Sequence, residues 1–198
     1  DPVTGVVNPT GPLTPIVVPT NTTLARATSA TTLNGNLDSA TAVAGTVTST
    51  MSVYDSLGNQ HNITLTYTKT GNNAWTVAPS TTDAAITGLT IANANLTFNA
   101  AGQLTAPAAP LTPTLAVTLN NGSVIPPTGT PGNVLSVNVS ALSQLAQTSN
   151  VTQASQDGLA PGTLTGLSVV SNTGMVTGIF SNGLTMSIGQ VALANFTN

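Results

Sequence analysis

The first residue to consider for chemistry is His61, because it is the only imidazole in the chain. Asp55 lies shortly before it, across a predicted hairpin loop, so an Asp–His pair is within reach. Such a pair also needs an activated nucleophile or a metal ion before it can catalyse a reaction, and the sequence pattern supplies neither. We therefore interpret His61 as a solvent-facing polar residue at the start of a strand.

A second candidate is the segment 55–59, Asp-Ser-Leu-Gly-Asn, which has some features of an oxygen-ligand loop for calcium. Calcium takes roughly six to eight oxygen ligands and usually several carboxylates, whereas this segment has a single carboxylate. We expect a turn instead. In that turn Asp55 accepts backbone hydrogen bonds through its side chain, and Gly58 takes the left-handed conformation.

Aromatic residues and asparagines supply two further candidates. Trp75, Tyr54 and Tyr67 could form a platform for sugar rings, but three aromatics around a hairpin more often pack across strands. Asn-x-Ser/Thr triplets accept glycans in secreted eukaryotic proteins, yet a chain so rich in Asn and Thr contains many by chance. They begin at Asn21, Asn62, Asn95, Asn121, Asn138, Asn150 and Asn195. We predict no catalytic, cofactor-binding or metal-binding residue.

Charged residues are scarce, and this excludes several classes of protein. The 198 residues include five acids and two bases, so 4% are charged, against about 25% in an average soluble domain. The two cations, Arg26 and Lys69, cannot neutralise a nucleic acid or an anionic membrane surface. The absence of cysteine excludes thiol enzymes, disulfide scaffolds and Cys-ligated metals. With so few groups for acid–base catalysis, we expect neither an enzyme nor a cofactor.

The composition nevertheless predicts a folded chain. Hydrophobic residues make up 40% of it, and the mean hydropathy is +0.26. Aromatic residues are only 3%, so the core must be built from Val, Leu, Ile and Ala. No apolar run approaches the roughly 20 residues that span a membrane. The first residues have neither a basic region nor an apolar stretch, so we expect no signal peptide.

Alternation of apolar and polar residues predicts β-strands along most of the chain. The clearest are 47–54, 63–68 and 75–77, joined by turns at 55–59 and 71–73, which together predict an antiparallel meander. Further strands are expected at 16–18, 86–91, 95–99, 115–119, 134–139, 164–170, 175–180 and 185–191.

Other segments give weaker signals. Asn34-Gly35 indicates a turn, and Pro/Gly-rich residues 106–113 and 126–133 indicate loops. Residues 142–146 have helical spacing and predict one short turn of helix. Pro161-Gly162 indicates a break before the last set of strands. Short strands separated by turn signals are typical of an all-β sandwich or barrel.

Two stretches match a known family in order and spacing. The first contains Val-Tyr-Asp-Ser-Leu-Gly-Asn-Gln-His at 53–61, followed by Lys-Thr-Gly at 69–71 and Trp75. The second begins at Asp157-Gly158 and ends in Gly-Gln-Val-Ala-Leu-Ala-Asn-Phe at 189–196. Together they resemble the bacterial flagellar hook proteins over most of the chain. Leu159 and Phe180 depart from that pattern, because tyrosine is usual at both positions.

The resemblance implies two antiparallel β-sandwich or barrel-like domains, one inserted into the other and joined by a short two-strand linker. Residues 1–23 with 159–198 would form the inner domain, and residues 24–158 the inserted outer domain. The helical core segments that flank these domains in the family are missing from this chain. We therefore expect the 198-residue chain alone to be monomeric.

The resemblance also implies a function. The chain would be a structural subunit of the extracellular flagellar hook, a helical tube that acts as a flexible universal joint between motor and filament. Its partners would be copies of itself and the rod, hook-cap and hook–filament junction proteins, and it would leave the cell through the flagellar type III apparatus, with no nucleic-acid or membrane partner. The alternative is a surface adhesin, S-layer or phage-fibre module that binds carbohydrate through Trp75.

Overall fold

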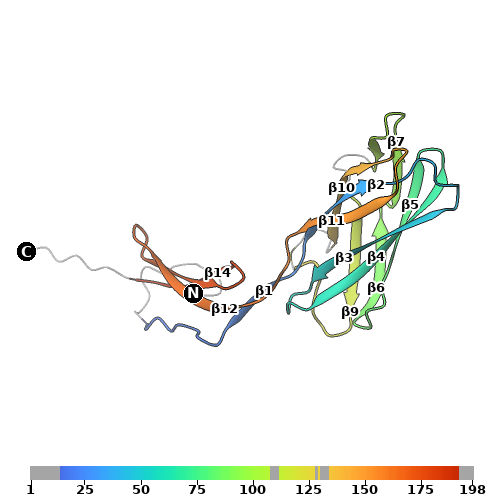
Figure 1. Ribbon diagram of the computed structural model, residues 1–198. Helices are drawn as coiled ribbons and strands as arrows, with labels where there is room; N and C mark the ends of the chain where they lie inside the picture. Colours follow the sequence, from blue (N-terminus) through green and yellow to red (C-terminus); the bar gives the residue numbers. More distant parts are fainter. Residues whose placement is uncertain (1–13, 108–111, 128, 130–133, 192–198) are drawn as a thin grey trace, which may run out of the picture. The chain divides into compact units, whose positions relative to one another are not determined.

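A computed structural model describes residues 14–107, 112–127, 129 and 134–191 of the chain (Figure 1). Every regular element among them is a β-strand, which confirms the all-β expectation. The strands are β1 (Thr23–Arg26), β2 (Ala30–Asn36), β3 (Thr46–Tyr54), β4 (Gln60–Gly71), β5 (Ala74–Ser80), β6 (Ile86–Ala92), β7 (Asn95–Phe98), β8 (Leu104–Ala106), β9 (Thr114–Leu119), β10 (Leu135–Ser143), β11 (Asn150–Gln156), β12 (Leu159–Val170), β13 (Met175–Phe180) and β14 (Thr185–Gln190).

The chain divides into two compact units. Unit 1 combines Asp1–Ala25 with Pro161–Asn198, and unit 2 is Arg26–Ala160. The boundary therefore falls once inside β1 and once inside β12. Unit 2 contains two five-stranded sheets, with strand orders β3-β4-β5-β7-β8 and β11-β2-β10-β9-β6.

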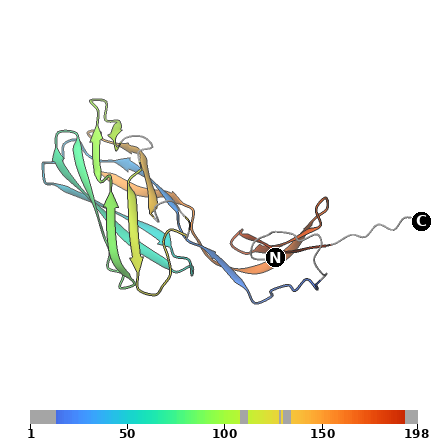
Figure 2. The same ribbon diagram turned by 180° about the vertical axis from the view of Figure 1, so that it is seen from behind.

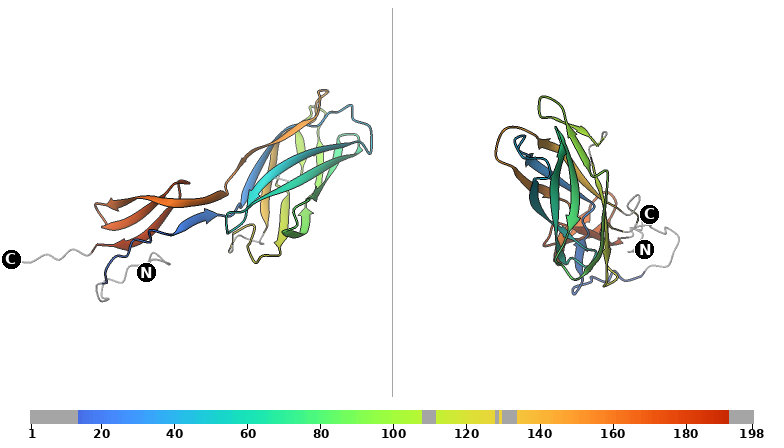
Figure 3. Two further views of the ribbon diagram at one scale, coloured as in Figure 1. Left: turned by 60° about the horizontal axis from the view of Figure 1, so that its bottom comes forward. Right: turned by 90° about the vertical axis from the view of Figure 1, so that its right-hand side faces the viewer.

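The first sheet of unit 2 is built around the predicted meander. β3 pairs antiparallel with β4 from Thr46↔Thr68 to Tyr54↔Gln60, and β4 continues antiparallel onto β5. Threonine is the commonest residue in these strands, and its β-branched side chain fits a pleated surface. Figure 3 (left) brings β3 and β4 to the front of the unit, and Figure 2 shows β6 and β9 of the other sheet side by side.

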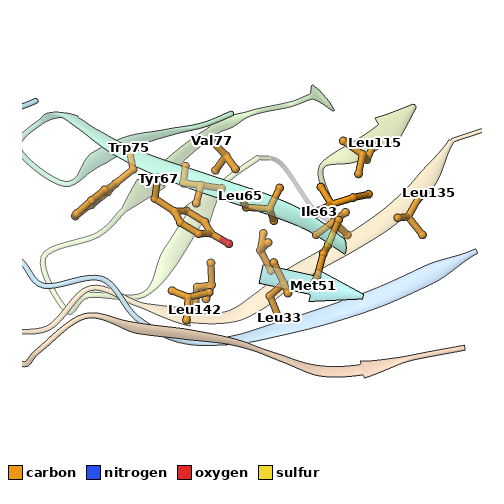
Figure 4. Close-up of a cluster of buried hydrophobic side chains, with 14 of the residues drawn as sticks. Leu33, Met51, Ile63, Leu65, Tyr67, Trp75, Val77, Leu115, Leu135 and Leu142 are labelled. Carbon is orange, nitrogen blue, oxygen red and sulfur yellow. The ribbon is translucent and has the colours of Figure 1, made fainter. Parts of the chain in front are cut away.

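The core of unit 2 lies between the two sheets. Alternate residues of the meander point inward, and leucines of the facing sheet complete the contact (Figure 4). Tyr67 and Trp75 are the largest of the fully buried side chains and have exposed fractions of 0% and 1%. Burying one large aliphatic side chain contributes about 1.5–3 kcal/mol. The aliphatic residues of this core that are 1% exposed or less are Leu33, Leu37, Met51, Val53, Ile63, Leu65, Leu96, Leu115, Leu135 and Val137.

Strand β2 was not expected, and the turn predicted at Asn34-Gly35 is wrong. Both residues lie within β2, which pairs antiparallel with β11 and parallel with β10. The pair β2–β10 is therefore an exception to the expected antiparallel arrangement. Gly35 has φ +138°, and a Cβ there would lie 1.8 Å from the carbonyl oxygen of Asn150. The glycine marks a close approach of two backbones rather than a turn.

The helical turn predicted at residues 142–146 is also wrong. β10 continues to Ser143, and its register with β2 shifts between Asn138 and Ala141. Before this irregularity the odd-numbered Val137 and Val139 are buried, and after it the even-numbered Leu142 is buried. A β-bulge inserts one residue and so reverses which side chains face the core. Leu145, which completed the helical spacing, follows the end of the strand and is exposed.

The edge strand β3 forms hydrogen bonds with β11 and with the segment that precedes β2. The amide of Gln153 on β11 accepts a hydrogen bond from the Ser52 backbone N–H (2.9 Å) and donates one to the Ser52 carbonyl (2.9 Å). The hydroxyl of Thr28 accepts from the Tyr54 N–H (2.8 Å), and the Thr28 N–H donates to the Tyr54 carbonyl (2.9 Å). These bonds satisfy backbone groups that an open edge would leave unpaired.

The described part of unit 1 contains one four-stranded sheet, in the order β1-β12-β13-β14. Its buried apolar residues are Val176, Phe180 and Ile188. Gly178 allows this packing, because a Cβ there would lie 2.8 Å from the Leu164 side chain.

The structure corrects two predictions in unit 1. Residues 16–18 form no strand, since Pro15 and Pro19 remove backbone donors on both sides. The break expected at Pro161-Gly162 does not interrupt a strand, because both residues lie within β12, although the boundary between the two units falls directly before Pro161. The loops predicted at 106–113 and 126–133 fall largely outside the described residues.

We predict that Gly35→Ala lowers the free energy of unfolding by about 3 kcal/mol, because the new methyl group collides with the Asn150 backbone at a φ that disfavours a side chain. Gly71→Ala is the matched control, since a Cβ at Gly71 meets no atom within 4 Å. Urea unfolding of both variants measures the difference. Equal stability of the two variants would contradict the close approach of β2 and β11.

Candidate functional site

The turn after β3 is organised by the carboxylate of Asp55. Its Oδ1 accepts hydrogen bonds from the backbone N–H groups of Leu57 (2.9 Å) and Asn59 (2.8 Å), and Gly58 has φ 86°. The interpretation of segment 55–59 as a turn is confirmed. The donors occupy the carboxylate that a calcium ion would need. Within the described residues no group of three or more His, Asp or Glu side chains is arranged to hold a metal ion.

The second carboxylate oxygen of Asp55 is the centre of a buried polar cluster. Oδ2 accepts hydrogen bonds from Ser123 Oγ (2.7 Å) and Asn59 Nδ2 (3.0 Å), and His61 Nε2 lies 3.3 Å away. Asp55 has an exposed fraction of 0%. Burial alone would raise the pKa of Asp55, but the hydrogen bonds from Ser123, Asn59 and His61 outweigh it and hold the pKa well below its usual range.

His61 is buried, so its interpretation as a solvent-facing residue is wrong. It occupies the position in β4 whose side chain faces the core, as Ile63 and Leu65 do further along the strand. Its Nδ1 lies 2.7 Å from Asp83 Oδ2, in the loop between β5 and β6. The backbone N–H of Ala85 and the ring of His61 lower the pKa of Asp83. The alternation of β4 could have placed His61 inside, whereas no sequence signal connected it to Asp83.

The geometry of this cluster suits a structural role. A serine-based triad requires the hydroxyl to donate its proton to the imidazole. Here the Ser123 hydroxyl contacts Asp55, and both ring nitrogens of His61 face carboxylates. The ring therefore has no free nitrogen with which to activate Ser123. What the arrangement does is hold three chain segments together.

The aromatic residues of the meander pack in the core. Trp75 is 1% exposed and donates its indole N–H to Gln144 Oε1 (2.8 Å), while Lys69 Nζ lies 5.8 Å from its ring centre. Tyr67 is also fully buried. The packing interpretation is confirmed for these two residues, and the sugar platform is wrong for them because stacking on a sugar needs an exposed ring face.

The fold does not test whether the predicted glycan acceptors are glycosylated. Asn21, Asn62, Asn95, Asn121 and Asn150 are exposed, and Asn138 is half-buried. Asn195 lies outside the described residues. Their glycosylation stays a prediction.

The outward face of the meander carries a regular array of threonines. Cross-strand pairing places Thr46 beside Thr68, Thr48 beside Thr66, and Thr50 beside Thr64. We call the outward threonines of these strands the threonine face. They are Thr46, Thr48, Thr50, Thr64, Thr66, Thr68 and Thr76. The face presents hydroxyl and methyl groups and no charge.

We predict that Asp55→Asn lowers the free energy of unfolding by about 3–5 kcal/mol at pH 7, because an amide N–H₂ would face the donors that now bind Oδ2. The pKa of Asp55 is lowered on folding, so its contribution is present at neutral pH and is lost as the pH falls below about 4. Urea unfolding between pH 7 and pH 2 should therefore show a smaller acid loss in Asp55→Asn than in the wild type. Asp38→Asn, which changes an aspartate that accepts one local N–H, should keep the wild-type profile.

In the described residues no helix is long and apolar enough to cross a membrane.

A family model described as the flagellar basal body protein FlaE D2 domain matches residues 19–159. The flagellar hook protein FlgE of Salmonella typhimurium is 31% identical over 150 residues, and FlgE of Rhizobium meliloti is 35% identical over 153 residues. Each alignment covers 75% of this chain and 35% of the relative, so the chain spans little more than a third of those proteins.

Among solved structures, the Helicobacter pylori flagellar hook protein FlgE2 is similar at 19% identity and a TM-score of 0.43, over 74% of this chain and 32% of that one. The family match covers most of unit 2, including the β3–β4 turn and the buried cluster around Asp55. The chain therefore belongs to the FlaE D2 domain family of flagellar proteins.

Proposed function

We propose that this chain is part of a structural subunit of the flagellar hook, without enzymatic activity. Membership of the FlaE D2 domain family carries the proposal, and the relatives named flagellar hook protein support it. The subunit would pack with copies of itself into a helical tube outside the cell, the flexible joint between motor and filament. Its arrangement as an inner domain, residues 1–23 with 159–198, and an inserted outer domain, residues 24–158, belongs to this proposal.

The surface chemistry is compatible with that role. Subunits on opposite sides of a curved, rotating tube approach and separate in turn, so their contacts must change partners at low cost. Threonine hydroxyls form short, replaceable and often water-mediated hydrogen bonds. The threonine face carries no charge that would fix one register through an ion pair. Repeating contacts of this kind are heterologous and do not close into a ring.

The proposal extends to location and partners. The subunit would be exported by the flagellar type III apparatus, in agreement with the absence of cysteine in a chain that travels unfolded. The rod, hook-cap and hook–filament junction proteins would be its neighbours at the ends of the tube. The alternative function, carbohydrate binding through Trp75, is not favoured because that side chain is buried.

We expect antibodies raised against this 198-residue chain to label the curved segment between the cell surface and the filament in electron micrographs of the source bacterium. The physical reason is that an outer part of the subunit would be accessible along the whole tube. A strain lacking the gene is the control. Labelling of the filament, or of the cell surface away from the flagellum, would contradict the proposal.

We predict that Thr48→Lys combined with Thr66→Lys, introduced into the full-length protein, produces straighter hooks and lower swimming speed. Two adjacent ammonium groups on the threonine face would repel positive groups or pair with negative groups of neighbouring subunits. Either interaction would restrict the sliding of one subunit past the next. Thr48 is exposed and Thr66 is half-buried on the outer face, and substitutions at such surface positions change the free energy of unfolding by about 0.5 kcal/mol or less. Hook curvature is measured by electron microscopy, with Thr48→Ser and Thr66→Ser as the matched control. Unchanged curvature in the lysine variant would reject a sliding role for this face.

A further inference from the structure

His61 connects three chain segments at one end of unit 2. Asp55 comes from the turn after β3, Asp83 from the loop between β5 and β6, and Ser123 from the segment that follows β9. His61 itself is 3% exposed at the start of β4. Two backbone hydrogen bonds also join these segments, from the Ser56 N–H to the Val124 carbonyl (3.1 Å) and from the Asn120 N–H to the Ala85 carbonyl (3.0 Å). The side chains around His61 add the contacts between charged groups.

The two nitrogens of the ring both face carboxylate oxygens. Nδ1 lies 2.7 Å from Asp83 Oδ2, and Nε2 lies 3.3 Å from Asp55 Oδ2. A neutral imidazole has one N–H and one lone pair, so it can donate to only one of these oxygens. Its lone pair would then face an ionised carboxylate inside the protein, which is repulsive. An imidazolium donates to both oxygens.

The surrounding charges favour the same protonation state. Within the described residues the charged groups that face His61 are Asp55 and Asp83, while the third segment contributes the uncharged Ser123. The basic side chains have other partners. Arg26 donates to the Asp157 carbonyl and Lys69 to the Ser39 carbonyl. The cation that balances this pair of carboxylates is therefore His61.

We propose that His61 is an imidazolium in the folded protein at neutral pH and acts as a pH-sensitive latch for the turn 55–59, the loop 81–85 and Ser123. Loss of the ring proton leaves one nitrogen lone pair against a carboxylate and loosens the junction. Asp55 keeps four other donors when this happens, from Leu57, Asn59 and Ser123. Asp83, whose side chain is 27% exposed, is the partner that moves. The latch is independent of the hook assignment.

The protonation state can be read directly, because the chain has one histidine. We expect the ring ¹⁵N signals of ¹⁵N-histidine-labelled protein at pH 7.5 to show a proton on both nitrogens. The same chain unfolded in urea should show mostly neutral imidazole at that pH, as an unperturbed histidine does. A neutral ring in the folded protein at pH 7.5 would overturn the proposal.

The latch itself is tested with Asp83→Asn, which keeps the acceptor for the Ala85 N–H and removes the charge beside His61. We expect this variant to raise the equilibrium constant for unfolding about tenfold at pH 6. At pH 9 we expect a rise of roughly threefold or less, because a neutral ring can accept a hydrogen bond from the new amide. The contribution is thus present at pH 6, where Asp83 is ionised and the ring is protonated, and it is lost as the pH rises and the ring gives up its proton.

The matched control is Asp38→Asn. Asp38 also accepts the backbone N–H two residues later, from Ala40 at 2.8 Å, and no histidine contacts it in the described structure. Its ratio of unfolding constants should be the same at pH 6 and pH 9. An Asp83→Asn ratio equally independent of pH would reject the latch. If Asp83→Asn does not fold, the ring ¹⁵N spectrum of the wild type still tests the imidazolium on which the latch depends, and a neutral ring would reject it.

Discussion

The packing of two sheets against one another in unit 2 is the interaction on which the other features depend. The chain has very few charges and few aromatic residues, so the burial of Val, Leu and Ile between these sheets is its main source of stability. Tyr67 and Trp75 fill the largest volumes in that layer. The buried side chains on the inner face of the meander hold its strands in place. Because successive side chains of a strand point to opposite faces, the threonines must then point outward. The turn at Asp55 and the loop at Asp83 are held where the same strands end.

Polar groups inside this layer are few, and each has a specific partner. The ammonium group of Lys69 lies near the Trp75 ring and donates to the Ser39 carbonyl, which holds the long connection between β2 and β3 against the core. Gln144 accepts from Trp75 and donates to Asn73. Buried polar groups without partners would cost more than these bonds contribute. Such pairs therefore specify where each loop lies and add little net stability.

The sequence predicted the parts of the fold in which alternation was uninterrupted. The β3–β5 meander is of this kind, since its inward residues follow a period of two. β13 and β14 were predictable because Asn/Gly turns separate them. Prediction failed where the backbone departs from regular pleating or where a strand is polar. The bulge in β10 changed the spacing, Gly35 lay inside a strand, and β11 has only Val151 buried. An edge strand of this composition has no apolar pattern to detect.

The candidate site shows the same division. The side-chain turn at Asp55 was predictable because its donors lie within four residues. Asp83 and Ser123 reach His61 and Asp55 only through tertiary pairing, so no local pattern could identify them. The burial of His61 followed from the strand's alternation, but a polar residue beside a turn favoured the opposite interpretation. His61 lies two residues before Ile63, so both side chains point to the same face of the strand, and this spacing predicts a buried histidine.

The position of β2 has a consequence for the order in which the protein folds. β3, β4, β5, β7 and β8 follow one another in their sheet in chain order, and only β6 interrupts them in the sequence, so this sheet requires only short loop closures. β2 precedes them all, yet it lies between β10 and β11, which come last in unit 2. A chain that emerges gradually from one end can form the meander early. The second sheet must wait for distant residues, and this non-local pairing makes it the slow step of folding.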